Sequence, residues 1–426
     1  MESTTTRQSR AEKPLERNRA SLSGTAPLAT MPSHGPDEGR HRIAYAIAVA
    51  PQPRSSFTND EVAELARRTS MVRVGLKPRG HAGSWTTGPR ATSPRLWLHV
   101  MRRSIHQPVT LLNAMWRLVR PAWRRPRHVL VALRAAVAAC YLADAVDVDL
   151  VHCQFGGPAA AGAYVWHRLT GVPYTVRAHA YDIYDAYSWA GTVFSASAGV
   201  IAISDHGAKS IKDRWGVDAQ VIRVGIPFGS ITVRPRRMPR EQPRLLSVGS
   251  LVAKKGHDLV IAAVELLSQS GTYLELDIVG AGSQAAQLKN RAAMVDGVRL
   301  RGARPNEEVR SAYQGYDLFV MGSRVAPSGD RDGIPVVLME AAAAKLPIVA
   351  TAVGGIPELI RAGVSGSLAE PTAASLAEAI RAALNNYSHS LAMADAAFDM
   401  VVHMHSLTGT VQELRDAWDH ILGIRT

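Results

Sequence analysis

Cysteine is almost absent from this chain. Of its 426 residues, only Cys140 and Cys153 are cysteine. Neither has a partner at metal-ligand spacing, and two cysteines are too few for a disulfide-rich scaffold. We therefore expect two reduced thiols, with no disulfide and no zinc site.

Acidic residues are missing from a long stretch of the first half. No Asp or Glu occurs between Glu64 and Asp144, whereas residues 65–143 contain fifteen Lys and Arg. Four of the eight tryptophans fall in the same segment: Trp85, Trp97, Trp116 and Trp123. Cations beside indoles are typical of a segment that lies on an anionic membrane surface, and a solvated arginine-rich face is the alternative. We expect no nucleic-acid partner, because no recognised binding module surrounds the segment.

No hydrophobic run is long enough to predict a transmembrane helix. The most apolar window, residues 128–146, is interrupted by Arg134 and Asp144 and suits a buried or surface helix. Residues 1–40 lack the apolar core of a secretory signal and are rich in Ser, Thr, Arg and Pro. We expect them to be a disordered tail, with Met31 as an alternative start. These features predict a cytoplasmic protein that is peripheral on the inner face of the membrane.

The rest of the chain alternates short apolar runs with amphipathic ones. Residues 42–51 predict a strand, and residues 59–68 predict a helix capped at Asn59 or Asp60. The same pattern recurs along the chain, and the predicted strands are apolar throughout, as parallel strands covered on both faces are. The fold class is therefore α/β, with two doubly wound, Rossmann-like domains.

Changes in composition set the domain limits. An Arg- and Pro-rich stretch at 233–243 predicts a linker between a first domain at 41–232 and a second domain at 244–400. The last segment, 401–426, is expected to be a helix that packs back toward the first domain. Ligands of such sheets bind at the carboxyl ends of the strands, so the site is expected there.

Two turns of the second domain combine a strand end with glycine or lysine. Gly280 and Gly282 lie between a strand and a helix, where a backbone without Cβ lets N–H groups approach a phosphate. Lys254 and Lys255 lie at a similar turn, where a lysine can neutralise a leaving diphosphate. A plain tight turn and a solvated lysine pair are the alternatives.

The segment "RDGIPVVLMEA", residues 331–341, gives these turns a context. Pro335 suits the first turn of a helix, and the N–H groups of Val336 and Val337 would then form an anion site. Glu340 lies about one turn further on, on an otherwise apolar helix. A buried carboxylate needs a partner, which ribose hydroxyls would supply. The alternative is that Glu340 is a structural hydrogen-bond acceptor.

Together these segments resemble the donor-binding domain of retaining glycosyltransferases of family four, which have the GT-B fold. The matching segments "GSLVAKKG", "IVGAGS", "RLRGARPNEEV" and "RDGIPVVLMEA" follow the family's order. The resemblance implies that Asp332 lies by the donor sugar, Glu340 holds the ribose and Lys255 contacts the diphosphate. It also implies a wider set of donor-binding residues: Ser250, Gly280, Gly282, Arg304, Gly333, Ile334, Val336 and Val337.

Three positions depart from the family pattern. Ser250 stands where the family often has arginine, so one diphosphate contact is missing or comes from elsewhere. Asp332 replaces the commoner glutamate and reaches one methylene less far. Pro335 often corresponds to glycine, which removes one N–H donor.

The first domain carries a looser form of the resemblance. His179 ends a predicted strand in an "AH-x-x-D" setting with Asp182, which the family places beside the donor sugar. Gly156 and Gly157 occupy the preceding turn and would allow close approach of an acceptor or donor. The first turn, "PQPRSSFTNDE", resembles the "S-x-T-F-x-x-x-E" pattern of colanic-acid-type exopolysaccharide transferases, with Phe57 and Glu61 matching.

The resemblance implies transfer of a sugar, with retention, from a nucleotide diphosphate donor to a glycan or lipid-linked acceptor. The donor would be a UDP- or GDP-sugar, and the product a polysaccharide or glycolipid. His179, Lys255 and Asp332 are the expected catalytic residues, and Gly156, Gly157 and Asp182 line the acceptor side. We find no carboxylate nucleophile in the first domain, which favours a front-face path, and we expect no metal and no cofactor. The alternatives are a sugar-nucleotide epimerase of the same fold and a degenerate transferase that acts as a scaffold.

Overall fold

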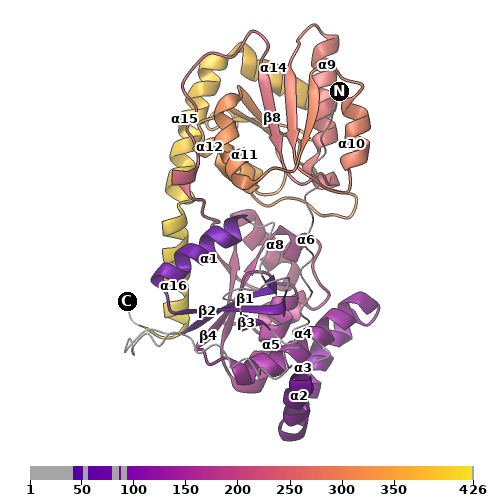
Figure 1. Cartoon of the computed structure of the whole chain (residues 1–426), viewed down its shortest axis with the longest axis vertical. Coiled ribbons are helices and arrows are strands. Elements are labelled where there is room, and N and C mark those ends of the chain that lie inside the picture. Colours follow the sequence, from indigo (N-terminus) through magenta and orange to yellow (C-terminus); the bar gives the residue numbers. More distant parts are fainter. Residues whose placement is uncertain (1–41, 51–55, 79–85, 88–93, 425–426) are drawn as a thin grey trace, which may run out of the picture. The chain divides into compact units, whose positions relative to one another are not determined.

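The computed structural model describes residues 42–50, 56–78, 86–87 and 94–424 (Figure 1). The predicted tail at 1–40 and Trp85 lie outside the described residues. The described chain contains two separate sheets in which the strands are parallel. The α/β class predicted from the alternating pattern is confirmed.

The first sheet has seven strands in the order β3-β2-β1-β4-β5-β6-β7. The strands are β1 (Ile43–Ala50), β2 (Met71–Pro78), β3 (Thr86–Thr87), β4 (Leu150–Cys153), β5 (Tyr174–Ala178), β6 (Gly199–Ala202) and β7 (Ala219–Val221). The helices of this half are α1 (Ser56–Arg68), α2 (Pro94–His106), α3 (Pro108–Val119), α4 (Pro126–Ala145), α5 (Pro158–Thr170), α6 (Ala180–Tyr184), α7 (Ala190–Ser195) and α8 (Asp205–Trp215).

Strand β1 shows how this sheet divides two cores. Ile43, Tyr45 and Ile47 pack with α1 on one face, whereas Ala44 and Ala46 pack with α3, α4, α5 and α7 on the other. This alternation follows from the two-residue period of a strand. The sheet is thus covered on both faces, which explains why its strands are apolar throughout.

Helix α1 begins earlier than the sequence predicted. It starts at Ser56, so the prediction that Asn59 or Asp60 caps it was wrong, and both lie inside the helix. Thr58 is already buried and Phe57 packs against a hydrophobic cluster, so the chain is held in the helix before these polar residues.

The second sheet has six strands in the order β10-β9-β8-β11-β12-β13. The strands are β8 (Arg244–Val248), β9 (Glu275–Val279), β10 (Val298–Gly302), β11 (Leu318–Met321), β12 (Ile348–Thr351) and β13 (Ser367–Ala369). Its helices are α9 (His257–Gln269), α10 (Ala285–Ala292), α11 (Asn306–Ala312), α12 (Val336–Ala343), α13 (Ile356–Leu359), α14 (Ala373–Asn385) and α15 (Tyr387–Met404). One buried cluster joins α9, α10 and α14 to the sheet, and another joins α11, α12 and α15.

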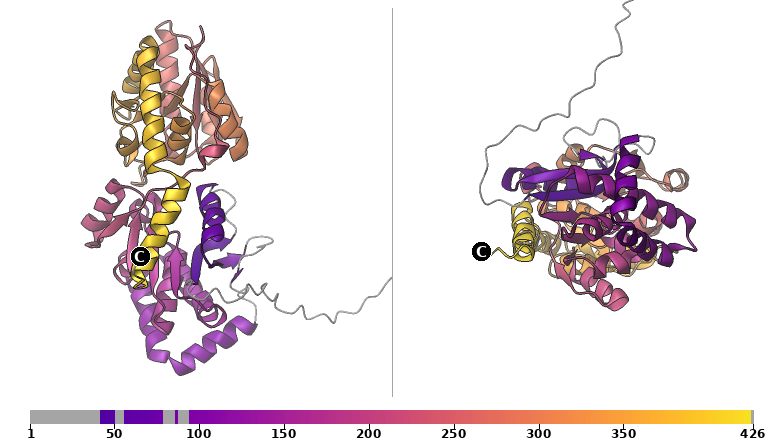
Figure 2. Two further views of the ribbon diagram at one scale, coloured as in Figure 1. Left: turned by 90° about the vertical axis from the view of Figure 1, so that its left-hand side faces the viewer. Right: turned by 90° about the horizontal axis from the view of Figure 1, so that it is seen from below.

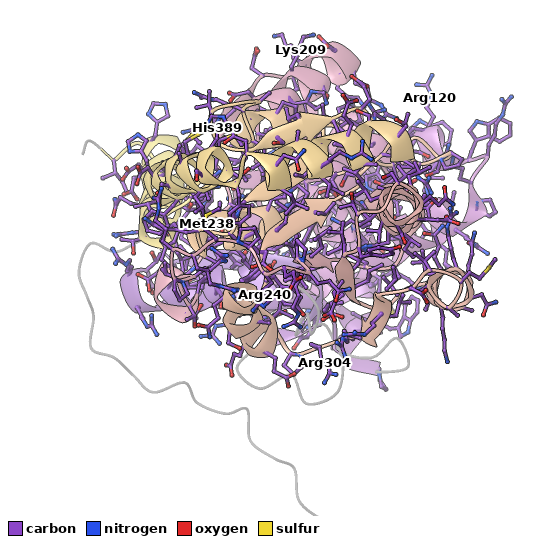
Figure 3. All side chains as sticks on the ribbon, turned by 90° about the horizontal axis from the view of Figure 1, so that it is seen from above. Arg120, Lys209, Met238, Arg240, Arg304 and His389 are labelled. Carbon is purple, nitrogen blue, oxygen red and sulfur yellow. The ribbon has the colours of Figure 1, made fainter. Side chains whose placement is uncertain are left out.

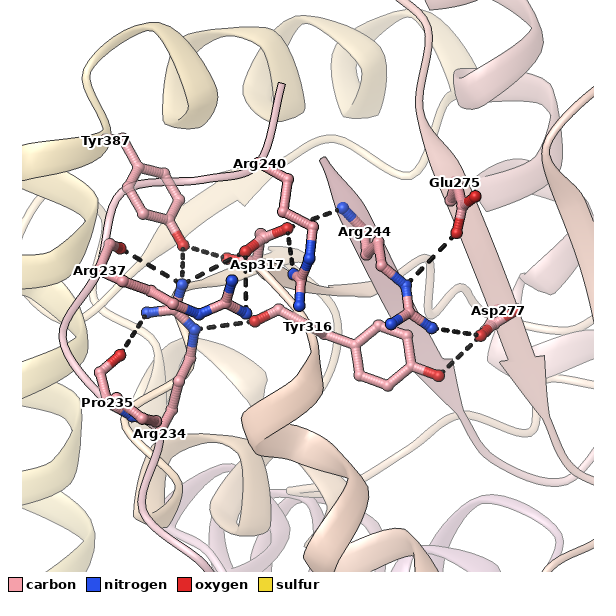
Figure 4. Close-up of polar contacts among 10 residues, drawn as sticks. All are labelled: Arg234, Pro235, Arg237, Arg240, Arg244, Glu275, Asp277, Tyr316, Asp317 and Tyr387. Carbon is pink, nitrogen blue, oxygen red and sulfur yellow. Dashed lines mark hydrogen bonds and ion pairs between the residues drawn. The ribbon is translucent and has the colours of Figure 1, made fainter. Parts of the chain in front are cut away.

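The arginines of the segment predicted as a linker, 233–243, tie it to the second domain (Figure 4). They surround the fully buried Asp317: Arg240 lies 2.8 Å, Arg237 3.3 Å and Arg234 3.4 Å from its carboxylate oxygens. A buried carboxylate is costly without cations, so this part of the linker is fixed to the domain.

The chain ends on the first sheet rather than the second. After α15 a short turn leads into α16 (Leu407–Ile421), and both are drawn in yellow in Figure 2. Trp418 of α16 is buried and its Nε1 donates to His152 Nδ1 at 3.3 Å. At the turn, a Cβ on Gly225 would lie only 2.5 Å from Leu407 Cα, so the two crossing segments are in close contact.

Helix α4 is long and apolar enough, by length and composition alone, to cross a membrane. Its window has a mean hydropathy of 1.5, and 39% of it is buried in the protein. Seven of its residues are buried, most of them alanines that contact α5 and the first sheet. This packing agrees with the prediction that the window is a helix of the folded domain.

Candidate active site

The carboxyl edge of the second sheet holds a compact group of charges around Asp332. The side chain is 8% exposed, and its Oδ1 lies 2.9 Å from Lys255 Nζ. Its Oδ2 accepts from Ser323 Oγ at 2.9 Å. Lys254 binds Asp330 at 3.0 Å and lies 4.0 Å from Asp332. Lys255 and Asp332, predicted separately, are therefore brought together as an ion pair.

Asp330 and Asp332 form an Asp-x-Asp pair, two carboxylates with one residue between them, which was missed in the sequence. Such a pair can hold a divalent cation when it faces open space. Here each carboxylate has a lysine instead. Among the described residues, no group of three or more His, Cys, Asp or Glu is arranged to hold a metal ion.

Helix α12 begins one residue later than Pro335. Pro335 is the N-cap, with a ψ of 129°, and its carbonyl accepts from Leu338 N at 3.0 Å. The prediction that Pro335 lies in the first helical turn was therefore wrong. As the N-cap, it contributes only its carbonyl to the hydrogen bonds of the helix. Val336 and Val337 are the first two helical residues, whose N–H groups have no acceptor within an α-helix.

Glu340 already has partners within the protein. It is 5% exposed, and it accepts from Arg310 Nε at 3.0 Å and from Tyr313 Oη at 3.1 Å. Each carboxylate oxygen thus has a donor, so Glu340 is paired without the ribose, as the alternative of a structural hydrogen-bond acceptor requires. Burial raises the pKa of Glu340, and Arg310 opposes that rise.

Arg310 is a residue that sequence reasoning missed. It is 5% exposed and also binds Asp60 at 2.8 Å and Ser230 at 3.2 Å. The only sequence signal was an arginine on a short helix directly after the "RGARP" loop. It connects α1, α11 and α12 through one guanidinium group.

The glycines after β9 pack closely against the turn that follows β8. A Cβ on Gly280 would lie 1.8 Å from Gly249 O, and one on Gly282 would lie 2.3 Å from Leu251 O. Gly280 N donates to Gly302 O at 2.9 Å, so this N–H is not available for a phosphate. The predicted role for the Gly280 amide was wrong, because the turn lies against the turn that follows β8. Ser250 lies in that neighbouring turn and is exposed.

Arg304 lies at the surface, where Figure 3 labels it. Its guanidinium is 3.8 Å from Glu308, and both side chains are more than half exposed. It lines a cavity of about 250 Å³ beside Asp277 and Tyr316. The side chain is thus free to contact a ligand at this end of the sheet.

His179 directly follows β5, at the N-cap of α6, and lies close to two aromatic rings. Its ring centroid lies 4.6 Å from that of Phe155 and 5.4 Å from that of Phe57. Burial lowers the pKa of His179 well below its usual value, so the imidazole is neutral near pH 7. Its Nε2 is buried without a hydrogen-bond partner among the described residues, so the hydrogen-bonding capacity of this nitrogen is unused.

Asp182 fixes the turn that carries His179. Its Oδ2 accepts from His179 N at 3.0 Å, and burial raises the pKa of Asp182 to about 7, opposed by the amides of His179 and Gly156. A Cβ on Gly156 would lie 2.9 Å from Phe194, and one on Gly157 would lie 3.0 Å from Tyr187. The prediction that these glycines leave room for substrate was wrong, since the protein's own side chains fill the space.

The predicted residues of the two halves meet at the loop before α12. A Cβ on Gly333 would lie 3.8 Å from Ala180, the residue after His179. Arg331 lies over the ring of Tyr184, 4.7 Å from its centroid. Ile334 is buried in a cluster that also contains residues of the first half. Asp332 and His179 therefore belong to the same region.

A second missed group is a buried ion pair under the first sheet's carboxyl edge. Arg177 is fully buried and pairs with Glu61, which also accepts from Tyr45 Oη at 2.9 Å. Arg177 also donates to the carbonyls of Ile222 and Arg223. The sequence signal was an arginine inside an otherwise apolar strand. Glu61, which matched the colanic-acid-type pattern, is thus a structural partner that fixes α1.

Known proteins were compared with the chain by sequence and by structure. AmsK, the amylovoran biosynthesis glycosyltransferase of Erwinia amylovora, is 41% identical over 152 residues, which is 35% of this chain and 37% of the relative. WcaL of Escherichia coli K12, named for colanic acid biosynthesis, is 34% identical over 166 residues, 38% of this chain and 41% of the relative. The chain thus matches about two fifths of the length of these relatives.

The structure of HepE from Anabaena in complex with UDP and glucose superposes with a TM-score of 0.65 at 16% identity, covering 89% of this chain and 100% of that one. At this identity the likeness shows the fold, which is GT-B, as predicted. Two family models match consecutive parts of the chain: "Glycosyltransferase Family 4" at residues 90–227 and "Glycosyl transferases group 1" at residues 232–400. The predicted resemblance is confirmed, and the chain carries the two successive domains of the glycosyltransferase family 4 and group 1 type.

Proposed function

We propose that the protein is a retaining glycosyltransferase of exopolysaccharide or glycolipid biosynthesis. It transfers a sugar from a nucleotide diphosphate donor to a glycan or a lipid-linked acceptor. The observation that carries the proposal is the pair of Lys255 and Asp332 beside the N-terminus of α12, at the carboxyl edge of the second sheet. Relatives named as glycosyltransferases support the reaction class.

Lys255 and the first N–H groups of α12 supply positive charge where a diphosphate leaving group would develop negative charge. Such preorganised donors are strongest in a partly desolvated site. Asp332 would orient hydroxyls of the donor sugar, and Glu340 would accept from the ribose with lone pairs not used by Arg310 and Tyr313.

His179 acts from the first domain as a neutral imidazole. Its unpartnered Nε2 can donate to or accept from a sugar hydroxyl, and Asp182 fixes the backbone that carries it. Its lowered pKa favours hydrogen bonding over transfer of a full charge. A front-face path, in which the leaving diphosphate assists the incoming hydroxyl, needs no carboxylate nucleophile.

The epimerase and the scaffold were the alternatives in the sequence. No relative reported above is named as either, and nothing in the described site favours them. The Ser250 and Pro335 departures were the only support for a degenerate site. The N-cap position of Pro335 weakens that support, because a proline there costs α12 none of its own N–H groups.

A panel of UDP- and GDP-sugars with bacterial membrane extract as acceptor tests the reaction. We expect one donor to be consumed with release of its nucleoside diphosphate and formation of an α-configured product from an α-linked donor. An inverted linkage would contradict the retaining mechanism. Interconversion of the sugar nucleotide without transfer would identify an epimerase.

The protein also works at a membrane in this proposal, through an apolar and basic surface on α2, α3 and the start of α4. Large apolar side chains here are between 48% and 77% exposed: Trp97, Leu98, Met101, Ile105, Val109, Leu112, Trp116, Trp123 and Leu130. The guanidinium of Arg124 lies over the Trp123 ring, and Arg120, labelled in Figure 3, is also exposed. Each such cation contributes about 1 kcal/mol at an anionic surface.

Vesicle flotation tests this surface. Phosphatidylglycerol-containing vesicles should bind the protein more strongly than phosphatidylcholine vesicles, and added salt should weaken the binding. Replacing Trp97 and Trp116 by serine should reduce the bound fraction, whereas Met294→Ser, an exposed apolar control at 84% exposure, should not. Equal binding by both variants would rule this surface out as the membrane contact.

A further inference from the structure

Aromatic rings cluster directly after His179, on a part of the first domain that the donor chemistry does not use. The rings of Tyr187 and Trp189 are stacked, with centroids 4.6 Å apart and an interplanar angle of 17°. Tyr181 meets Tyr187 at 6.4 Å in an edge-on arrangement, and His128 lies 4.9 Å from Tyr187. The cluster therefore extends from the His179 turn to the first turn of α4.

The rings of this cluster differ in their exposure to solvent. Trp189 is fully buried and supports Tyr187 from below, whereas Tyr181 is 46% exposed. Tyr187 is also in contact with the Gly157 turn, because a Cβ there would lie 3.0 Å from its ring. The rings are thus fixed by packing, and an exposed aromatic side chain on a rigid support is a ready contact surface for a ligand.

The polar groups around the rings suit a ligand with hydroxyls. Burial, with the neighbouring Tyr187, raises the pKa of Tyr181 to about 12, so its hydroxyl stays a donor at neutral pH. The exposed carboxylate of Asp185 lies close enough to Tyr181 to raise that pKa further. A pyranose presents both features that this surface matches, an apolar C–H face for a ring and hydroxyls for polar atoms.

The same cluster adjoins the apolar and basic surface of α2 and α3. His128 Nδ1 lies 3.0 Å from Ser188 Oγ, and Thr192 Oγ1 donates to the Arg117 carbonyl at 3.5 Å. Burial lowers the pKa of His128, and the nearby Arg125 guanidinium lowers it further, so the imidazole is neutral near pH 7 and Arg125 is the cation beside the cluster. A ligand on Tyr181 thus has exposed apolar side chains and a cation within reach on the adjoining segment.

We propose that Tyr181 and Tyr187 form the binding platform for the acceptor sugar, and that this sugar is attached to a lipid whose chain lies toward α3 and the start of α4. This inference rests on the proposed function and adds the acceptor class to it. The stacked Trp189 fixes Tyr187, and Tyr181 provides the exposed ring. Asp182 accepts from His179 N and so fixes the first turn of α6, the helix that carries Tyr181.

Octyl glycosides test the platform, because each joins one sugar to a short alkyl chain. Octyl glucoside, galactoside, mannoside and N-acetylglucosaminide are used below micelle formation, with saturation-transfer NMR on the full chain. We expect saturable binding of at least one of them, weakened about ten-fold in Tyr181→Ala. Tyr181→Phe, which keeps the ring, should stay within about three-fold of the parent. Tyr273→Ala, a control at an exposed tyrosine of the second domain, should bind as the parent does.

The outcomes separate the parts of the proposal. If no octyl glycoside binds the parent chain, or if Tyr181→Ala binds as tightly as the parent, the platform is wrong. If free sugars bind as tightly as their octyl forms, the lipid attachment is wrong. Calorimetry with UDP and GDP is run on the same proteins, and Tyr181→Ala should keep the parent's affinity. If the parent chain binds neither UDP nor GDP, the proposed function is contradicted. Glycoside binding that depends on Tyr181 would still support the sugar platform.

Discussion

Arg310 and Glu340 give the sharpest test of how this site is held. Both side chains are nearly buried, with Nε and Oε1 3.0 Å apart. Replacing Arg310 by methionine leaves Glu340 buried with Tyr313 as its remaining donor, whereas Glu340→Gln leaves Arg310 paired with Asp60. Because an uncompensated buried charge costs more than a lost hydrogen bond, the two variants should differ strongly.

The magnitude follows from the proton that Glu340 would take up. Neutralising a carboxyl with a reference pKa of about 4.3 at pH 7 costs about 3.7 kcal/mol, which bounds the electrostatic loss in Arg310→Met. Glu340→Gln should cost only about 1–2 kcal/mol. The pKa of Glu340 is already raised in the folded state, and it rises further without Arg310. The contribution of this group to the free energy of unfolding is therefore fully present at low pH and is lost as pH rises. Between about pH 7 and pH 5 the arginine variant should regain at most about 2.7 kcal/mol relative to the parent, because the pKa of Glu340 is already raised in the parent.

Urea unfolding at both pH values measures these differences, with Arg310→Met, Glu340→Gln and the double variant compared with the parent. The double variant should be more stable than Arg310→Met alone, because it removes the unpaired charge. The reasoning is refuted if Arg310→Met is at least as stable as Glu340→Gln. It is also refuted if the loss of unfolding free energy in Arg310→Met does not change with pH. UDP and GDP binding by Glu340→Gln is measured in parallel, since a purely structural carboxylate would leave both affinities unchanged.

Three further predictions concern neighbouring groups. Lys255→Met should weaken UDP or GDP binding by about 10- to 100-fold in calorimetry, while Lys254→Met, the matched control, should weaken it less, and equal effects would contradict the assignment. Asp182→Asn removes a group whose folded pKa is about 7. The parent should therefore lose roughly 2 to 3 kcal/mol relative to this variant between about pH 5 and pH 8, and parallel thermal-unfolding curves would contradict it. Gly282→Ala should destabilise the fold by about 1–3 kcal/mol because its Cβ would lie 2.3 Å from a backbone oxygen, whereas Gly315→Ala, which meets nothing within 4 Å, should stay within about 0.5 kcal/mol in urea unfolding.

The parallel sheets could be predicted because their evidence is local. A continuous apolar strand followed by an amphipathic helix is visible in a short window, and its repetition fixes the class of fold. The same holds for Lys255 and Asp332, since each follows a strand and must lie at the carboxyl edge of the sheet. Their contact could be anticipated from topology, although its distance could not.

The partners of buried groups could not be predicted, because they come from distant parts of the chain. Arg310 meets Asp60 across a separation of 250 residues, and nothing near either residue in the sequence indicates the other. The role of Gly280 was predicted wrongly for a related reason. A glycine is required equally where a ligand approaches and where the protein's own backbone does, and only the structure shows that Gly280 faces Gly249.

These partners change how donor binding should be understood. A diphosphate that engages Lys255 competes with Asp332 for the same cation rather than meeting a free lysine. Asp332 would then retain Ser323 Oγ as a donor and has Lys254 at 4.0 Å, close enough to take over the neutralisation with a small movement of its side chain. The second lysine and the second aspartate therefore have a purpose in the proposed reaction. They allow the ion pair at Lys255 to open without leaving Asp332 buried and unpaired, at the moment when it must contact the donor sugar.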